Sequence, residues 1–408
     1  MSIDRRTPPP WLALLFVFLI STLLSACDGG SASPTAQQAI KHVFVITLEN
    51  ENYATIFGPN SAAPYLSRTL VSKGAHIEQY YGTGHASLDN YIAMISGQPS
   101  TKETINDCEL KYLDFVQTGT TADGFPIGTG CVYPATVKTL VDQLTYAGYT
   151  WKGYEGDMGN DPTREDATCG HPPLNDVDLT NNPQAPSADV PLGDSYATRH
   201  NPFMYFHSII DSPSCAKNVV NLNRLSVDLR EIETTANFNF ITPSTCDDGH
   251  DSPCANGAPG GLMSADSFLK TWVPIITSSP AFQKDGLLII NFDESSYASL
   301  TTGIHGVTLT YSGDTCCSQQ KGPNLPEYPL ELSSGLATLN VNNYGGDRTG
   351  AVLISKYIKP GTVTTVPYNH YSMLRSLEDI FGLSYLGYAA QAGLVPFGDD
   401  IYTNPAGQ

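Results

Sequence analysis

The run at residues 42–53, HVFVITLENENY, constrains the fold of this chain more than any other segment. Residues 43–48 are all apolar or β-branched, which predicts a strand buried inside a sheet. The run ends abruptly in Glu49 and Asn50, whose side chains carry carboxylate and amide oxygens. In open α/β sheets, ligands bind beyond the carboxyl ends of the strands, so these two residues are candidates for a site. The alternative is an ordinary polar exit from a strand.

A second buried strand is predicted at residues 286–292, GLLIINF, and it also ends in oxygen ligands, Asp293 and Glu294. If the two strands are neighbours in a parallel sheet, their four polar side chains converge at one edge. Hard oxygen donors suit Mg, Ca or Mn, and Zn if imidazoles join them. The two strand ends therefore predict a site for one divalent metal ion.

Between them, the glycine-rich segment 82–97 predicts a turn followed by a helix that starts near Ser87. A serine there is either a helix cap or a hydroxyl at the positive end of a helix, where a phosphate group is favoured. Asn90 lies on the same helix face and could donate its amide to a phosphoryl oxygen.

Histidines supply further candidates. His250 and Asp251 lie in a loop rich in carboxylates between Cys246 and Cys254, a composition that favours a site over an ordinary turn. His200 follows an arginine among aromatic residues, and His370 starts a predicted helix at 368–381. For His200 the alternative is a histidine with a purely structural role.

The rest of the chain predicts one large α/β domain or two smaller ones. Two segments rich in loops, 100–134 and 159–195, are expected to be surface excursions. Further helices are expected at 64–72, 136–148, 221–234 and 264–282 (at least up to Pro274), and further strands at 75–80, 150–158, 237–241, 303–311 and 351–357.

The formal charge of −19 argues against a nucleic-acid partner, because phosphate backbones need a basic face. Residues 1–27 have the pattern of an export signal, with two arginines, an apolar run and small residues before Cys27. The ending LLSAC resembles the bacterial lipobox, which implies anchoring to a membrane of the cell envelope through a lipidated Cys27; a plain signal peptide is the alternative. A flexible tether is expected at 28–40, and a single domain at 41–408.

Eight cysteines remain after Cys27, an even number that suits an oxidising compartment. Their spacing suggests local bridges from Cys108 to Cys131 and within the 246–254 loop. The adjacent pair at 316 and 317 needs either a vicinal bridge or separate partners, and the remaining connectivity stays open.

Seven motifs together resemble the secreted bacterial phosphoesterases, which include acid phosphatases and phosphatidylcholine-type phospholipases C. They are LEN at 48–50, HASLDNY at 85–91, WKGYEGDM at 151–158, RHNPFMYF at 199–206, ITPSTCDDGHD at 241–251, NFDES at 291–295 and NHYSMLRSLEDIFGL at 369–383. The resemblance implies an alkaline-phosphatase-like α/β fold, a three-layer αβα sandwich with a mostly parallel sheet and long disulfide-stapled loops.

The resemblance also implies roles for the candidates. Ser87 is the expected phosphoryl-accepting nucleophile, and Glu49, Asn50, Asp293 and Glu294 are the expected metal ligands. The expected contacts to phosphate or the leaving group come from His250, His200, His85 and His370.

The expected function is an acid-phosphatase-type phosphomonoesterase that uses a phosphoserine and a divalent metal. Its substrate is a small phosphate ester or a phospholipid headgroup. A phospholipase C-type diesterase is the alternative, and a lipid-anchored binding module without catalysis is a rival. Glu294 departs from the family, since acid phosphatases often have aspartate there.

Overall fold

The computed structural model describes residues 35–303, 306–334, 337–404 and 407. The predicted export signal at 1–27, the lipidated Cys27 and the first part of the predicted tether lie outside these residues.

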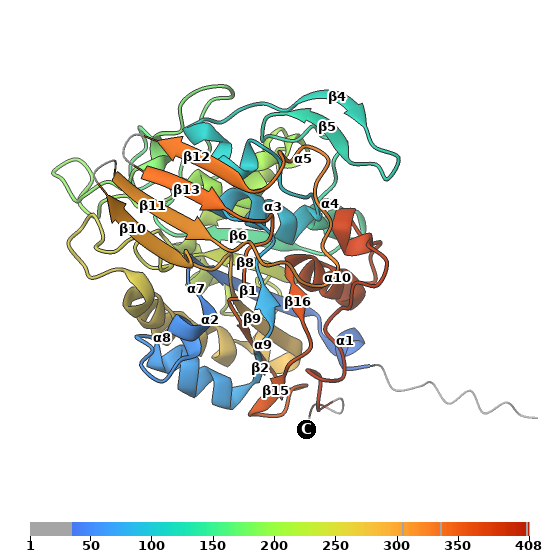
Figure 1. Cartoon of the computed structure of the whole chain (residues 1–408). Helices are drawn as coiled ribbons and strands as arrows, with labels where there is room; N and C mark the ends of the chain where they lie inside the picture. The colour runs from blue at the N-terminus through green and yellow to red at the C-terminus, as the bar shows by residue number, and fades with distance from the viewer. Residues whose placement is uncertain (1–34, 304–305, 335–336, 405–406, 408) are drawn as a thin grey trace, which may run out of the picture. The chain divides into compact units, whose positions relative to one another are not determined.

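The fold is built on an eight-stranded sheet in the order β15-β2-β14-β9-β1-β8-β6-β7 (Figure 1). Every pair of neighbours is parallel except the two pairs that include β14. The strands are β1 (His42–Leu48), β2 (Ala75–Ile77), β6 (Trp151–Glu155), β7 (Val219–Asn221), β8 (Phe238–Thr242), β9 (Gly286–Phe292), β14 (Ala351–Ser355) and β15 (Thr362–Thr364).

The two strands predicted to converge are neighbours. β1 and β9 pair in parallel over their whole length, from His42 opposite Gly286 to Leu48 opposite Phe292. All seven residues of each strand are buried, as expected for a central strand covered on both faces. The register places the residues after Leu48 beside those after Phe292, at one edge of the sheet.

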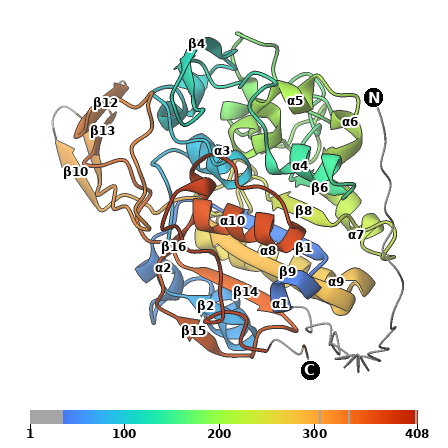
Figure 2. The ribbon, with the colours of Figure 1, turned by 90° about the vertical axis from the view of Figure 1, so that its right-hand side faces the viewer.

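Helices cover both faces of this sheet, so the predicted three-layer α/β arrangement with a mostly parallel sheet is confirmed. Val43 and Val45 pack into a core shared with α3 and α10, whereas Phe44, Ile46 and Leu48 pack into a core shared with α8. Figure 2 shows α3 and α10 next to each other. The first core includes residues of α1 (Ala36–Ala39), α3 (Ser87–Ser96), α4 (Leu140–Tyr146) and α10 (His370–Phe381), and the second includes residues of α2 (Tyr53–Phe57), η1 (Tyr65–Leu70), α7 (Leu225–Asp228), α8 (Gly261–Ser278) and α9 (Pro280–Asp285).

Smaller sheets lie outside these layers. The strand expected at 303–311 corresponds to β11 (Gly306–Tyr311), which belongs to a separate four-stranded sheet with β10 (Ser299–Gly303), β13 (Ala337–Val341) and β12 (Leu330–Ser334). The excursion at 100–134 contains a hairpin, β4 (Val116–Thr120) and β5 (Pro126–Thr129). A two-stranded pair joins β3 (Tyr80–Tyr81) to β16 (Tyr368–Asn369).

Two expectations about local structure differ from the structure. The helix expected at 221–234 is shorter, because residues 219–221 add β7 to the sheet edge beside β6; a 3-10 turn, η7 (Leu222–Arg224), and the four-residue α7 follow, and the rest is turns. The helix expected at 264–282, at least up to Pro274, is by contrast confirmed, since α8 runs past Pro274 to Ser278 with Val273 and Ile276 buried in the core. Residues 36–39 of the expected tether form α1.

Residues 36–39 form a helix rather than a flexible tether because the helix is capped locally and packs against the core. Thr35 and Gln38 form a reciprocal capping box around its first turn, which satisfies two backbone N–H groups. Ile40, directly after the helix, is completely buried. The packed part of the chain therefore starts by Ala36, which is buried six residues before β1.

Four disulfides link pairs of cysteines within the described chain. They join Cys108 to Cys131, Cys169 to Cys215, Cys246 to Cys254 and Cys316 to Cys317. The two bridges suggested by spacing are confirmed, and the adjacent pair forms the vicinal bridge. None of the helices in the described part of the chain combines the length and the apolar character that crossing a membrane requires.

Candidate active site

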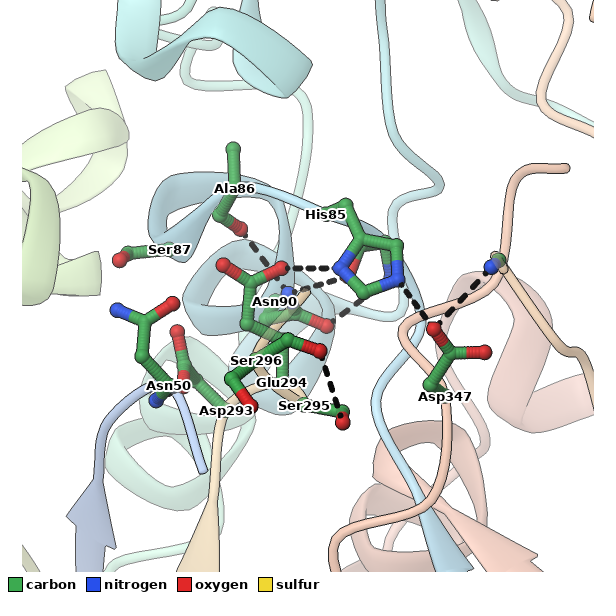
Figure 3. Close-up of polar contacts among 12 residues, drawn as sticks. Asn50, His85, Ala86, Ser87, Asn90, Asp293, Glu294, Ser295, Ser296 and Asp347 are labelled. Carbon is green, nitrogen blue, oxygen red and sulfur yellow. Dashed lines mark hydrogen bonds and ion pairs between the residues drawn. The ribbon is translucent and has the colours of Figure 1, made fainter. Parts of the chain in front are cut away.

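The ends of β1 and β9 are tied together by their first polar residues. The backbone N–H of Asp293 donates to the carbonyl of Leu48 (2.9 Å), and the N–H of Asn50 donates to Asp293 Oδ1 (3.0 Å). Asn50 has a φ of 58°, a left-handed conformation that turns the chain directly after Glu49. Figure 3 shows Asn50 and Asp293 side by side above the two strands.

Ser87 is the first residue of α3, and its hydroxyl points to this strand end. The N-cap position belongs to Ala86, which has no side-chain cap, so the capping alternative for Ser87 was wrong. Ser87 Oγ instead donates to Glu49 Oε2 at 2.8 Å, and the Asn50 amide donates to the same oxygen at 3.1 Å. Ser87 is 3% exposed and Glu49 is completely buried. The hydroxyl therefore lies at a helix start, against a carboxylate.

Asn90 has a different set of contacts from the one expected. Its Oδ1 accepts from the backbone N–H groups of Thr83 (2.7 Å) and Gly84 (3.1 Å), and its amide donates to the carbonyls of Gly84 and Ala86 (both 3.0 Å). The side chain therefore holds the turn that leads into Ser87, and its amide is occupied within the protein.

Glu49 belongs to a buried group that could hold a metal ion. Ligand atoms of Glu49, His200 and Asp248 all lie within 4.8 Å of one another. His200 Nδ1 is 3.2 Å from Asp248 Oδ2, and His200 Nε2 is 3.6 Å from Glu49 Oε2. Asp248 lies in the predicted cysteine-closed loop, but the sequence favoured its neighbours His250 and Asp251.

Three ligand atoms at this group have no hydrogen-bond partner in the described part of the chain. They are Glu49 Oε1, Asp293 Oδ2 and His200 Nε2, all fully buried. Buried polar atoms are normally satisfied, so these atoms are an exception that a bound ion would explain. Two carboxylate oxygens and an imidazole nitrogen are also the donors that Mn or Zn prefer. The residues present therefore fit a divalent cation.

The electrostatics agree with this fit. Burial, followed by repulsion from Asp293 and Asp248, raises the pKa of Glu49 well above its usual range. Burial raises the pKa of Asp293 to about 6. Burial together with Arg199 and His250 lowers the pKa of His200 well below its ordinary value, so the imidazole stays neutral, as a metal ligand must. A bound cation would favour the ionised forms of these carboxyl groups and so lower their raised pKa values.

Glu294, the fourth expected metal ligand, faces another partner. Its Oε2 is 2.9 Å from His85 Nδ1, and His85 Nε2 is 2.9 Å from Asp347 Oδ2 (Figure 3). Burial opposes a charge on His85, but its hydrogen bonds to Asp347 and Glu294 raise its pKa to about 9. His85 is therefore an imidazolium clamped between two carboxylates. Asp347 was not a candidate, because its segment showed no pattern that pointed to a site.

His250 lies at the opening of the site. Its Nδ1 is 2.9 Å from Asp251 Oδ1, and its Nε2 is 3.2 Å from an Arg199 guanidinium nitrogen. Arginine can only donate, so Nε2 accepts and Nδ1–H donates to Asp251. A cleft of about 600 Å³ lined by Asn50, His250 and Tyr311 opens here. Arg199 is 6% exposed. It was not among the candidates from the sequence, although its position directly before His200 could have indicated that it lies at the site.

His370 is completely buried behind the strand end. Its Nε2 donates to the carbonyl of Asp293 at 2.6 Å, so its Nδ1 accepts from the hydroxyl of Tyr80 at 3.0 Å. Burial lowers its pKa to about 4. Both ring nitrogens are occupied within the protein, and the ring holds the backbone of Asp293.

The family of the chain follows from comparison with known proteins. The sequence model of the Phosphoesterase family matches residues 59–384, which include Ser87, Asp248, His250 and Asp293. The chain belongs to the Phosphoesterase family. The resemblance drawn from the seven motifs is thereby confirmed.

Curated relatives of this Phosphoesterase-family chain include a probable acid phosphatase of Kluyveromyces lactis, 21% identical over 86% of this chain and 60% of the relative. An acid phosphatase of Aspergillus fumigatus is 21% identical over 70% of this chain and 54% of the relative, so the chain spans less than two thirds of both. A phosphatidylinositol-3-phosphatase of Mycobacterium tuberculosis is 21% identical over 93% of this chain and 90% of the relative. Among solved structures, an alkaline phosphatase superfamily protein of Vibrio parahaemolyticus is 13% identical over 86% of this chain and 68% of its own, with a TM-score of 0.46.

Proposed function

We propose that the chain hydrolyses phosphoric esters, as a phosphomonoesterase of the acid phosphatase type that forms a phosphoserine at Ser87. One observation carries the proposal: the Ser87 hydroxyl lies at the start of α3 and donates to Glu49 Oε2 at 2.8 Å, beside buried oxygen and nitrogen atoms that have no hydrogen-bond partner among the described residues. The membership in the Phosphoesterase family and the acid phosphatase relatives support it.

In the first step, Ser87 Oγ attacks the phosphorus atom in line with the leaving oxygen, and its proton passes to Glu49 Oε2. Glu49 Oε2 is placed to accept that proton, because Ser87 Oγ already donates to it at 2.8 Å. As the bond from Oγ to phosphorus forms, the bond to the leaving oxygen breaks. His250 Nε2 exchanges its contact with the Arg199 guanidinium for a proton from water and donates that proton to the leaving oxygen, so the product leaves as a neutral alcohol.

In the second step, water attacks the phosphoserine and gives a proton to His250 Nε2. The bond from Oγ to phosphorus breaks, and Oγ recovers its proton from Glu49. Asp251 keeps His250 oriented through the hydrogen bond to Nδ1. Backbone N–H groups at the start of α3 and the Arg199 guanidinium stabilise the negative phosphoryl oxygens.

We further propose that one divalent cation is held by Glu49, Asn50 and Asp293, with His200 and Asp248 beside them. Such an ion lowers the pKa of a serine hydroxyl and offsets phosphoryl charge when bound. The proposal assigns Glu294 and His85 to the support of the strand end, and His370 to the position of the Asp293 backbone.

The export and anchoring inferred from residues 1–27 remain part of the proposal. The four disulfides support an oxidising compartment such as the bacterial cell envelope. Metabolic labelling with a palmitate analogue tests the anchor, since wild type should incorporate the label and Cys27→Ala should not.

The activity is tested with p-nitrophenyl phosphate and p-nitrophenylphosphorylcholine, with and without EDTA. Wild type should release p-nitrophenol from the monoester, EDTA should abolish the release, and an added divalent cation should restore it. Ser96→Ala is a matched control, because it removes a hydroxyl from the other end of α3. Preference for the choline diester would favour a phospholipase C-type activity, and release undiminished in Ser87→Ala would contradict the nucleophile.

A further inference from the structure

The start of α3 already carries an anion. Asp107 Oδ1 accepts from the backbone N–H of Leu88 at 3.0 Å, one residue after Ser87. Its other oxygen, Oδ2, is 3.8 Å from Nε of Arg199. The same Arg199 contacts His250 through its guanidinium, so Asp107 lies between the helix start and the cation of the site.

These two donors are also the ones that a phosphoryl group needs. A phosphate at a helix start accepts from free backbone N–H groups, and an arginine beside it pairs with its oxygens. Ala86 supplies no cap, so the Leu88 N–H has its partner in a side chain from a distant loop. The carboxylate of Asp107 therefore satisfies the donors in the way that a phosphate ester would.

The loop that carries Asp107 has an unusual backbone. Asp107, Cys108, Glu109 and Leu110 have φ values of 43°, 59°, 56° and 59°, four consecutive residues in the left-handed region without a glycine. Such conformations are unfavourable for L-residues and persist where the surroundings impose them. The Cys108–Cys131 disulfide, the contacts of Asp107 and backbone hydrogen bonds such as that from the Cys108 N–H to the Glu103 carbonyl (2.9 Å) hold this turn. Because the side chain of Asp107 is 26% exposed, it can leave its position without unfolding the core.

We propose that Asp107 is a built-in competitor of the phosphoryl group: a phosphate ester, or the product phosphate, must displace its carboxylate from the Leu88 N–H and from Arg199 to bind at Ser87. The inference rests on the proposed function for the identity of the substrate. When the site is open in only a fraction of the molecules, the apparent affinity for phosphate equals the intrinsic affinity multiplied by that fraction. Asp107 thus weakens the binding of inorganic phosphate and speeds product release.

The test compares Asp107→Ala, Asp107→Asn and Glu109→Gln with wild type, all with the divalent cation bound. Glu109 is a matched control, because it is exposed on the same turn and has the same charge. Asp107→Ala removes the acceptor of the Leu88 N–H and breaks the partly exposed ion pair with Arg199. We expect the inhibition constant of inorganic phosphate to fall about tenfold. Asp107→Asn should show a smaller fall, because asparagine can still accept from Leu88 but carries no charge. Glu109→Gln should leave the constant unchanged.

An unchanged or higher inhibition constant in both Asp107 variants would overturn the inference. So would a loss of kcat at constant phosphate affinity, because that result would make Asp107 a proton donor. A shift of the melting temperature by inorganic phosphate gives the same comparison without turnover. It decides the inference even if no ester is hydrolysed, in which case the proposed function alone fails.

Discussion

Asp293→Asn is expected to stabilise the metal-free protein at neutral pH. Asp293 is completely buried, and its Oδ2 has no partner among the described residues. The contact that it does make, the hydrogen bond from the N–H of Asn50, can be kept by the asparagine oxygen. The substitution therefore removes a costly buried charge and retains the geometry.

The magnitude follows from the pKa. Burial raises the pKa of Asp293 from 3.8 to about 6, so the folded state holds the proton more tightly than the unfolded state. The free energy of unfolding then falls as the pH rises from about 4 to about 6, and it stays lower above that window. This shift in pKa corresponds to roughly 3 kcal/mol of the free energy of unfolding. Asparagine does not ionise, so the variant keeps this stability at high pH.

Urea unfolding after EDTA treatment measures this difference. At about pH 8 the variant should be more stable than wild type, and near pH 4 the two should converge. A bound divalent cation should reverse the order, because only wild type has the carboxylate to bind it. Asp266→Asn is the control: Asp266 is buried but accepts from two backbone N–H groups and pairs with Lys270, so its loss should destabilise with and without metal. Equal destabilisation by both substitutions without metal would refute the reasoning.

Three further predictions concern the residues around the strand ends. His85→Gln removes the imidazolium between Glu294 and Asp347 and should lower the free energy of unfolding by about 3 kcal/mol in urea unfolding, since two carboxylates are left without their cation. His250→Gln should lower kcat for an alkyl phosphate about 100-fold and for p-nitrophenyl phosphate less, because with p-nitrophenyl phosphate only the second step needs His250. Replacing Cys246 and Cys254 by serine should lower the free energy of unfolding by about 2–3 kcal/mol, measured by urea unfolding under oxidising conditions.

The convergence of β1 and β9 could be predicted because both strands are local apolar runs that end in oxygen ligands. A run buried on both faces must be central, and parallel neighbours place their ends at one edge. Ser87 could be placed at a helix start for a similar reason, from the glycine-rich turn and the apolar face that follows. These features are encoded within single segments.

Asp248, Asp347 and Arg199 could not be assigned in this way. Their positions depend on how distant loops fold back, and a carboxylate in a loop looks the same in sequence whether it reaches the site or solvent. Glu294 shows the same limit, since only the structure shows that it faces His85. The edge strand β7 was missed because a short apolar segment is a strand only when a sheet edge is available to pair with it.

The central claim is that Ser87 carries the phosphoryl group during turnover. Its most direct test is to quench the enzyme with acid during hydrolysis of p-nitrophenyl phosphate and to examine the peptide that contains Ser87 by mass spectrometry. The account predicts one added phosphoryl group on Ser87 in wild type and an increased amount in His250→Gln, in which the second step is slowed. Active enzyme with an unmodified Ser87, or a phosphoryl group on another residue, would contradict it.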